Sequence, residues 1–121
     1  MAIRNSRNIR YAVIGEFNEE AIEYIEAQIG EKLEPHDSLY KGDYWLHRRN
    51  DPELNIELRI NVDPMHDSAS DPEDEYYFDY KNKDCALLLD IDGDPMLVEE
   101  ISSRISCNPK FRLVLKEDYT W

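Results

Sequence analysis

One segment of the chain, residues 54–62, alternates strictly between aliphatic and polar side chains. Because successive side chains of a strand point to opposite faces of a sheet, this pattern predicts a strand with one buried face and one face in water. The chain must therefore build a sheet and cover one side of it. The aliphatic positions are Leu54, Ile56, Leu58, Ile60 and Val62.

Two amphipathic helices are expected to supply that cover. The first begins after Asn18, a good N-cap residue, and ends at Gly30. The second begins at Asp94, with Pro95 in the first helical position, and ends before Asn108 and Pro109. Each carries an apolar stripe at helical spacing. The stripes are Ala21, Ile22, Ile25 and Ile29 in the first helix and Leu97, Val98, Ile101 and Ile105 in the second.

Further strands are expected at residues 9–16, 43–49, 76–80, 85–91 and 111–115, whereas 31–42 is expected to be a loop and 50–52 a turn. The segment 85–91 is nearly continuous in apolar residues, which favours a central strand covered on both faces. The order is β-α-β-β-β-β-α-β. It predicts an α+β fold, a mostly antiparallel sheet of about five to six strands with both helices on one face. A ferredoxin-like core with extra strands fits this order, and the strand order in the sheet stays open.

A chain of 121 residues is expected to form one domain over residues 1–121, with a flexible N-terminal segment at 1–8 and a long acidic loop at 63–75. The first 15 residues carry arginines but no long apolar stretch, so no secretory signal is expected. Cys85 and Cys107 have no CxxC spacing, which favours two buried thiols over a disulfide. These features indicate a cytoplasmic protein.

The charge of the chain restricts its partners. Asp and Glu number 27 against 14 Lys and Arg, for a formal net charge of −13. Such a chain cannot neutralise phosphates on the scale that generic nucleic-acid binding needs, and it is repelled by anionic membranes. The expected partner is a basic protein.

Asp90 and Asp92 follow an apolar strand in the sequence LLLDIDGDPM. This short stretch resembles the first motif of haloacid-dehalogenase phosphatases, which implies a nucleophile at Asp90 and a general acid at Asp92. Asp94 stands where that motif has Thr, and the later residues that the chemistry requires are absent. As an EF-hand loop the stretch fails at Pro95 and Ile101. A turn and helix cap explain it more simply, and we expect no catalytic residue, metal site or cofactor.

Acidic and aromatic residues come together in residues 63–80, where seven carboxylates occur without a Lys or Arg. Tyrosine gives rigid contact area with a polar tip, and a dense acidic field steers a basic partner. We therefore expect the partner to bind here, with the acidic face of the first helix as a second candidate. The candidate residues are Asp67, Asp71, Glu73, Asp74, Glu75, Tyr76 and Tyr77, and secondarily Glu19, Glu23 and Glu26.

In size, acidity and aromatic content, the chain resembles the immunity proteins of bacterial polymorphic toxins. That resemblance implies a stoichiometric inhibitor that covers a basic toxin domain, with a nuclease as the expected target. One alternative is a DNA mimic or other regulatory or anti-defence binding module that acts on a different enzyme. A third hypothesis is a small metal-dependent phosphatase that uses Asp90 and Asp92.

Overall fold

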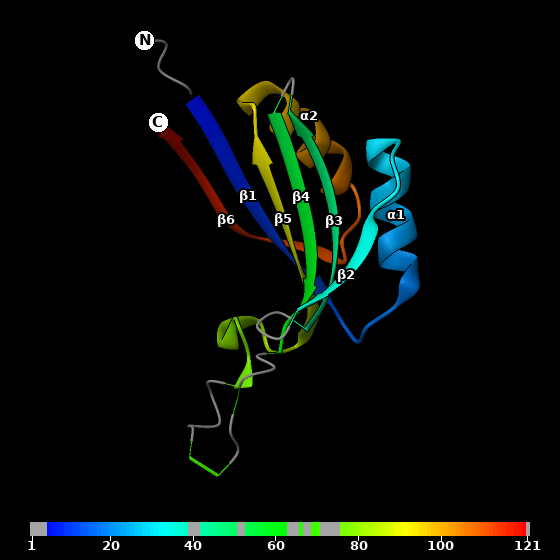
Figure 1. The fold of residues 1–121 in the computed structure, drawn as a ribbon, viewed down its shortest axis with the longest axis vertical. Helices are drawn as coiled ribbons and strands as arrows, with labels where there is room; N and C mark the ends of the chain where they lie inside the picture. The colour runs from blue at the N-terminus through cyan, green and yellow to red at the C-terminus, as the bar shows by residue number, and fades with distance from the viewer. Residues whose placement is uncertain are drawn as a thin grey trace.

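The computed structural model describes residues 5–38, 42–50, 53–62, 66, 69–70 and 76–120. The strands are β1 Asn5–Ile14, β2 Glu34–Ser38, β3 Gly42–Asn50, β4 Glu53–Ile60, β5 Cys85–Gly93 and β6 Phe111–Thr120. The helices are α1 Glu19–Ile29, α2 Pro95–Ile105 and the short 3-10 helix η2 Tyr80–Asn82. The six strands form one sheet in the order β2-β3-β4-β5-β1-β6 (Figure 1).

Every neighbouring pair of strands in this sheet is antiparallel, as predicted. Four of the strands, in the order β4-β5-β1-β6, have the arrangement of a ferredoxin-like β-α-β-β-α-β core. In the chain, α1 and the hairpin β2–β3 lie between β1 and β4, and α2 lies between β5 and β6. The hairpin β2–β3 follows α1 in the chain and widens the sheet beyond β4.

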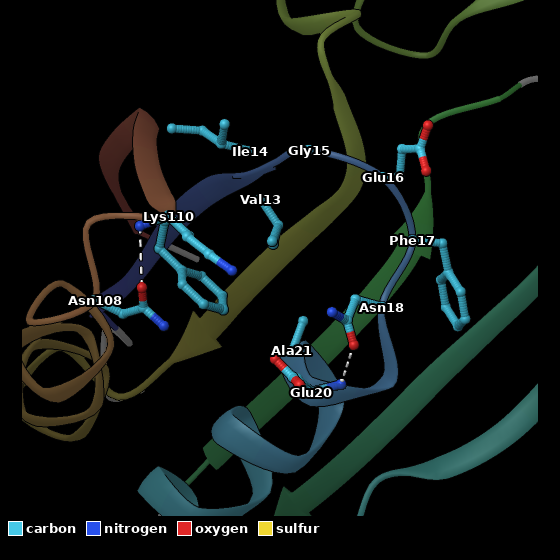
Figure 2. Close-up of a pocket in the computed structure, with 11 residues that line it drawn as sticks. Val13, Ile14, Gly15, Glu16, Phe17, Asn18, Glu20, Ala21, Asn108 and Lys110 are labelled. Atoms are coloured by element: carbon cyan, nitrogen blue, oxygen red, sulfur yellow. Dashed lines mark hydrogen bonds between the residues drawn. The ribbon is translucent and has the colours of Figure 1, made fainter.

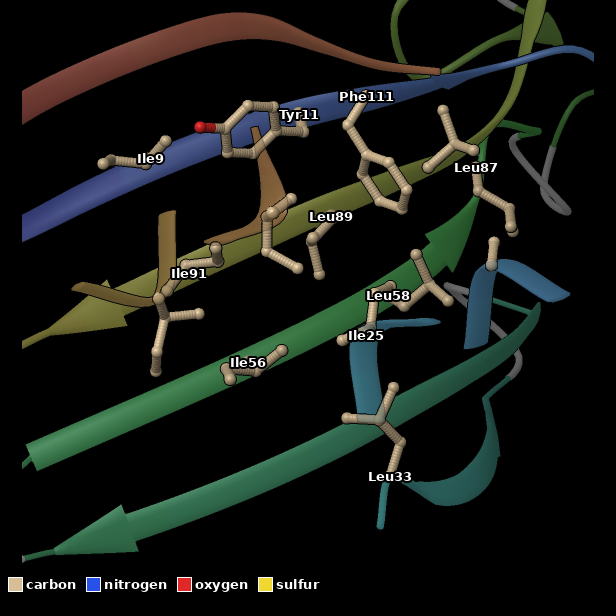
Figure 3. Close-up of a cluster of buried hydrophobic side chains, with 14 of the residues drawn as sticks. Ile9, Tyr11, Ile25, Leu33, Ile56, Leu58, Leu87, Leu89, Ile91 and Phe111 are labelled. Atoms are coloured by element: carbon tan, nitrogen blue, oxygen red, sulfur yellow. The ribbon is translucent and has the colours of Figure 1, made fainter. Parts of the chain in front are cut away.

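Both helices cover the same face of the sheet, because their apolar residues share one core with alternate residues of the strands (Figure 3). The alternation predicted for 54–62 is confirmed over most of β4, since Leu54, Ile56 and Leu58 are fully buried. It fails at its end, where β4 stops at Ile60 and Asn61, expected in water, is buried. The helices contribute Ala21, Ile25, Val98, Ile101 and Ile105 to this core.

The helix ends follow the predicted capping residues. The side-chain oxygen of Asn18 accepts a hydrogen bond from the backbone N–H of Glu20 at 2.8 Å, and Gly30 ends α1 in the left-handed conformation. Asp94 caps α2 by accepting a hydrogen bond from the backbone N–H of Leu97 at 3.1 Å. The local sequence is therefore sufficient to define both helices.

The prediction of a loop at 31–42 is wrong in part, because Glu34–Ser38 forms the strand β2 and pairs with β3. This strand lies at the edge of the sheet, where Pro35 is tolerated, and it has no aliphatic alternation to reveal it. The segment 1–8 is also not simply flexible, since residues 5–8 pair within β1. Residues 51–52 of the predicted turn lie outside the described residues.

The prediction of a strand at 76–80 is wrong. Residues 76–79 form a bent segment that leads into η2 instead of joining the sheet. The prediction for 85–91 holds in part, because β5 is central but only one of its faces is covered by helices. On the other face Leu88 and Ala12 are buried all the same, within a small second cluster that Val114 of β6 packs against.

The two ends of the sheet differ in what they carry. β1 and β6 pair from Asn5 with Thr120 at one end to Val13 with Phe111 at the other. At the second end β1 and β4 finish and β5 begins, and the segment 76–84 lies against it (Figure 1). We refer to this second end as the aromatic end. None of the helices in the described part of the chain is long and apolar enough to cross a membrane.

Candidate protein-binding surface

A single buried side chain, Asn61, holds the segment 79–85 against the end of β4. Its amide oxygen accepts a hydrogen bond from the backbone N–H of Asp79 at 2.8 Å. Its amide nitrogen lies 3.1, 3.1 and 3.2 Å from the carbonyl oxygens of Asp79, Asn82 and Cys85. Because Asn61 is only 1% exposed, water cannot replace these bonds, and the segment is fixed in place.

Asn82 and Arg112 provide a second connection between this segment and the sheet. The side-chain amide of Asn82 donates to the carboxylate of Asp79 at 2.7 Å, and its oxygen accepts from the Arg112 guanidinium at 2.9 Å. Arg112 also donates to both carboxylate oxygens of Asp84, at 2.7 and 3.3 Å. These bonds from Arg112 lower the pKa of Asp84 below its ordinary value. The edge strand β6 is thereby linked to the turn that precedes β5.

The start of this fixed segment and the three residues before it form an aromatic cluster, which we define as Tyr76, Tyr77, Phe78 and Tyr80. Tyr76, Phe78 and Tyr80 are 42%, 38% and 45% exposed. The rings of Tyr76 and Tyr77 meet edge to face, with centroids 5.1 Å apart, and Tyr77 contacts Tyr80 at 6.2 Å. The ring of His66 packs against Tyr76 at 5.4 Å. Two tyrosines of the cluster, Tyr76 and Tyr80, are therefore exposed to solvent.

Two rings of the aromatic cluster carry cations from the chain itself. The guanidinium carbon of Arg59 lies 3.4 Å from the ring centroid of Phe78. The ammonium of Lys83 lies 4.6 Å from the ring centroid of Tyr80 and donates to its hydroxyl at 3.2 Å. The cluster therefore provides electron-rich faces that attract positive charge.

An apolar groove of about 340 Å³ separates the aromatic cluster from the end of β4. Ile60, Val62, Tyr76 and Tyr77 line it, with Glu16 also in its lining. The acidic run 63–75 is joined to the chain at Val62 and Tyr76. Both of its attachment points therefore lie at this one groove.

A second hollow, of about 430 Å³, lies where β1 turns into α1 (Figure 2). Gly15 and Glu16 line both hollows, so the two adjoin at this turn. Figure 2 shows the side chains of Glu16 and Phe17 pointing away from Val13 and Lys110. Because Glu20 and Lys110 both line this hollow, it has no single charge preference.

Exposed apolar side chains concentrate at the aromatic end. Phe17 is 45% exposed and stacks on Trp45 of β3, with centroids 5.7 Å apart and rings 21° from parallel. Among the described residues, five of the eight large exposed apolar side chains belong to this end. They are Ile14, Phe17, Tyr76, Phe78 and Tyr80. Exposed aromatic side chains gathered in this way are typical of protein–protein contact sites.

Only some of the predicted binding residues are described by the structure, and not all of those are free to contact a partner. Tyr76 and Tyr77 belong to the aromatic cluster, whereas Asp67, Asp71, Glu73, Asp74 and Glu75 lie outside the described residues. On α1, Glu19 and Glu23 are exposed. The carboxylate of Glu26 instead accepts a hydrogen bond from the backbone N–H of Leu33 at 2.7 Å, which gives it a role within the fold.

The aspartates that resemble a phosphatase motif all have partners within the chain. Asp90 pairs with Arg10 at 2.9 Å, and Asp92 accepts a hydrogen bond from the hydroxyl of Tyr119 at 2.5 Å. Burial and this bond raise the pKa of Tyr119 to about 12. Asp94 caps α2. Within the described residues no group of three or more His, Cys, Asp and Glu side chains could hold a metal ion.

The cysteines are both free thiols, but only Cys85 is buried, so the expectation of two buried thiols is half right. Burial raises the pKa of Cys85. The histidines lie apart. His36 stacks on Tyr44, His47 faces the helix side of β3 opposite Ile56, and His66 contacts the aromatic cluster.

Sequence reasoning missed the residues that organise the aromatic end. Asn61 occupies an ordinary polar position in the alternating strand, so its anchoring role left no mark on the sequence pattern. Phe17 and Trp45 lie 28 residues apart and come together only when β3 packs beside the start of α1. Comparison with protein-family models, curated proteins and solved structures found no match for this chain.

Proposed function

We propose that this chain is a small acidic binding protein that neutralises a basic protein partner, in the manner of an immunity protein that inhibits its toxin. One observation carries the proposal. The run of acids joins the chain at Val62 and at the exposed Tyr76, and both of these residues line one groove together with the half-buried Tyr77. Charge for attraction and aromatic area for anchoring are therefore adjacent at the aromatic end.

The distribution of positive charge supports this proposal. Each of the seven described arginines contacts a carboxylate, a side-chain amide or an aromatic ring of the chain itself. The described arginines are thus used within the fold, whereas the six acids of residues 63–75 have no Lys or Arg between them in the sequence. The net charge that can attract a partner is therefore negative.

A nuclease toxin is the expected target because its substrate groove is basic. Carboxylates of the acidic run would take the positions of substrate phosphates, and the tyrosines would fix the register of the complex. The long-range field would also accelerate association at low ionic strength. Inhibition would require no chemical step by the bound chain.

The experiment is a binding measurement with the protein encoded by the adjacent gene, by calorimetry at 50 and 500 mM NaCl. We expect binding that weakens about tenfold or more at high salt. The test variant combines Asp67→Asn, Asp71→Asn, Glu73→Gln, Asp74→Asn and Glu75→Gln, and should lose most of the affinity and its salt dependence. The matched control is Glu19→Gln with Glu23→Gln, which should keep both.

Two results would contradict the proposal. One is the absence of any basic partner, or an affinity that the five substitutions leave unchanged at both salt concentrations. The other is magnesium-dependent phosphatase activity that disappears in Asp90→Asn, which would favour the enzyme hypothesis. If the adjacent-gene product does not bind but another nucleic-acid enzyme is inhibited, the DNA-mimic alternative is correct.

A further inference from the structure

We propose that the hollow at the turn from β1 into α1 is a binding site for a free α-amino acid with an apolar side chain. The juxtaposition that carries it is an apolar floor with the ammonium of Lys110 at one wall and the carboxylate of Glu20 at the other. A ligand with a carboxylate, an ammonium and an apolar branch matches these three features. The inference does not depend on the proposed function, because it concerns a small molecule and not a protein partner.

The floor of the hollow is built by residues of the hydrophobic core. Val13 of β1, Ala21 of α1 and Phe111 of β6 line it, and each is at most 9% exposed. Because the core already holds these side chains in place, an apolar ligand group laid on them leaves water without having to order the protein. The volume of about 430 Å³ lies within the range of about 300–1,000 Å³ that is typical of small-molecule sites.

The walls of the hollow are fixed by hydrogen bonds. The backbone N–H of Ile14 donates to the carbonyl of Lys110 at 2.8 Å, which joins the end of β1 to the turn before β6. Within that turn, the backbone N–H of Lys110 donates to the side-chain oxygen of Asn108 at 3.0 Å (Figure 2). At the other wall, Asn18 caps α1. The site is therefore preorganised, which reduces the entropy that ligand binding must overcome.

The polar groups of the lining include four that have no partner among the described residues. They are the ammonium of Lys110, the carboxylate of Glu20 and the side-chain amide nitrogens of Asn18 and Asn108. The side-chain oxygens of the two asparagines are already used by backbone N–H groups. The lining can therefore bind a carboxylate through Lys110 and the amide nitrogens, and an ammonium through Glu20.

The neighbouring large side chains do not fill the hollow. Phe17 stacks on Trp45 with centroids 5.7 Å apart, and Figure 2 shows its ring directed away from Lys110. Glu16 is directed away in the same view. The two opposite charges that flank the floor are therefore those of Lys110 and Glu20.

Other classes of ligand match this lining less well. A simple anion would pair with Lys110 but meet the charge of Glu20, and a simple cation would have the reverse difficulty. A purely apolar molecule would cover the floor but would take water from both charges without replacing it, which costs free energy. A zwitterion pairs with both charges, and because its own net charge is zero, the −13 of the chain does not repel it.

The test is a titration of the whole protein with L-leucine, followed by calorimetry and amide chemical shifts. We expect saturable binding with a Kd of about 1 mM, and the largest shifts at Gly15, Ala21 and Lys110. Three probes each lack one feature of leucine. Glycine lacks the apolar side chain, N-acetyl-leucine lacks the ammonium and leucine amide lacks the carboxylate. Each should bind about tenfold more weakly than leucine, or worse.

Two variants assign the charges of the ligand to their partners. Glu20→Gln should weaken the binding of leucine about tenfold but should not weaken that of N-acetyl-leucine, which has no ammonium. Lys110→Gln should weaken leucine by about the same factor but should not weaken leucine amide, which has no carboxylate. The matched controls are Glu19→Gln and Lys81→Gln, since both residues are exposed and lie outside the lining. Both controls should bind leucine as the unaltered protein does.

The site is overturned if leucine does not bind, if the three probes bind as tightly as leucine, or if the controls lose as much affinity as Glu20→Gln and Lys110→Gln. None of these results bears on the proposed function, which is tested by salt-dependent binding of the adjacent-gene product. The absence of a basic partner would in turn leave the leucine titration unaffected, so the two proposals fail separately.

Discussion

Gly93 is the residue at which one added methyl group should disturb this fold most. Its backbone has φ +140°, a conformation that side chains rarely adopt, and a Cβ atom there would lie 2.8 Å from the carbonyl carbon of Glu53. The backbone N–H of Asp94 also donates to the Glu53 carbonyl at 2.8 Å, so the strand cannot move away without loss of that bond. This glycine lets β5 end against β4 and pass directly into α2.

Gly93→Ala should therefore destabilise the protein by about 3 kcal/mol or more, from strain and overpacking together. Gly30→Ala is the matched control, since Gly30 also has positive φ but a Cβ atom would meet nothing within 4 Å. It should cost only about 1 kcal/mol. Urea denaturation of both variants measures the difference, and equal losses would show that steric contact at Gly93 is unimportant.

Single residues also mark the limit of what the sequence can predict. Asn18, Gly30 and Asp94 were identifiable as helix caps because capping depends on residues only a few positions away. Asn61 was not, because its partners lie 18 to 24 positions further along the chain. Roles that depend on distant partners appear only when the chain is folded.

Among the elements, β4 could be predicted from the sequence, whereas β2 could not. The alternation in β4 predicted the burial of Leu54, Ile56 and Leu58, since one face of the strand packs in the core, although Ile60 at its end is only half-buried. β2 is a polar edge strand that owes its existence to pairing with β3, and its sequence carries no period. The prediction of a strand at 76–80 is wrong for the opposite reason. It has aromatic strand formers, but hydrogen bonds to Asn61 hold it in a bend.

This explanation predicts that the aromatic segment depends on Asn61. Asn61→Leu should destabilise the protein by about 2–4 kcal/mol, because buried backbone groups of Asp79, Asn82 and Cys85 lose their partners. It should also speed hydrogen exchange at the Asp79 amide. Urea denaturation and exchange monitored by NMR test both effects. Asn55→Leu, at a half-buried position of β4 whose side chain accepts only the long hydrogen bond from Arg48, is the control. A loss as large as that of Asn61→Leu would refute the anchoring role.

At the scale of the molecule, the −13 net charge has consequences for stability as well as for binding. The described arginines mostly pair within the chain, and the sequence as a whole has 27 acids against 14 Lys and Arg. Like charges repel in the compact state, and salt screens that repulsion over about 10 Å at 0.1 M. Added salt should therefore increase the stability of the fold but decrease the affinity for the proposed partner.

We expect the midpoint of thermal unfolding of the free protein to rise by about 3–6 °C between 10 and 500 mM NaCl, as repulsion is screened. Calorimetry measures it, with the variant that carries the five neutral substitutions at residues 67–75 as control. In that variant the rise should be about half as large. A midpoint that falls with salt would mean that the surface ion pairs outweigh the repulsion.

Asn5 and Thr120, the first and last described residues, pair with each other at the end of the sheet opposite the aromatic end (Figure 1). A fluorescent reporter or a sensor-chip linkage placed beyond either residue would start one strand length away from the groove and the tyrosines. Binding assays can thus attach a label next to Asn5 or Thr120 with the proposed surface left accessible, and signals from the two preparations should agree.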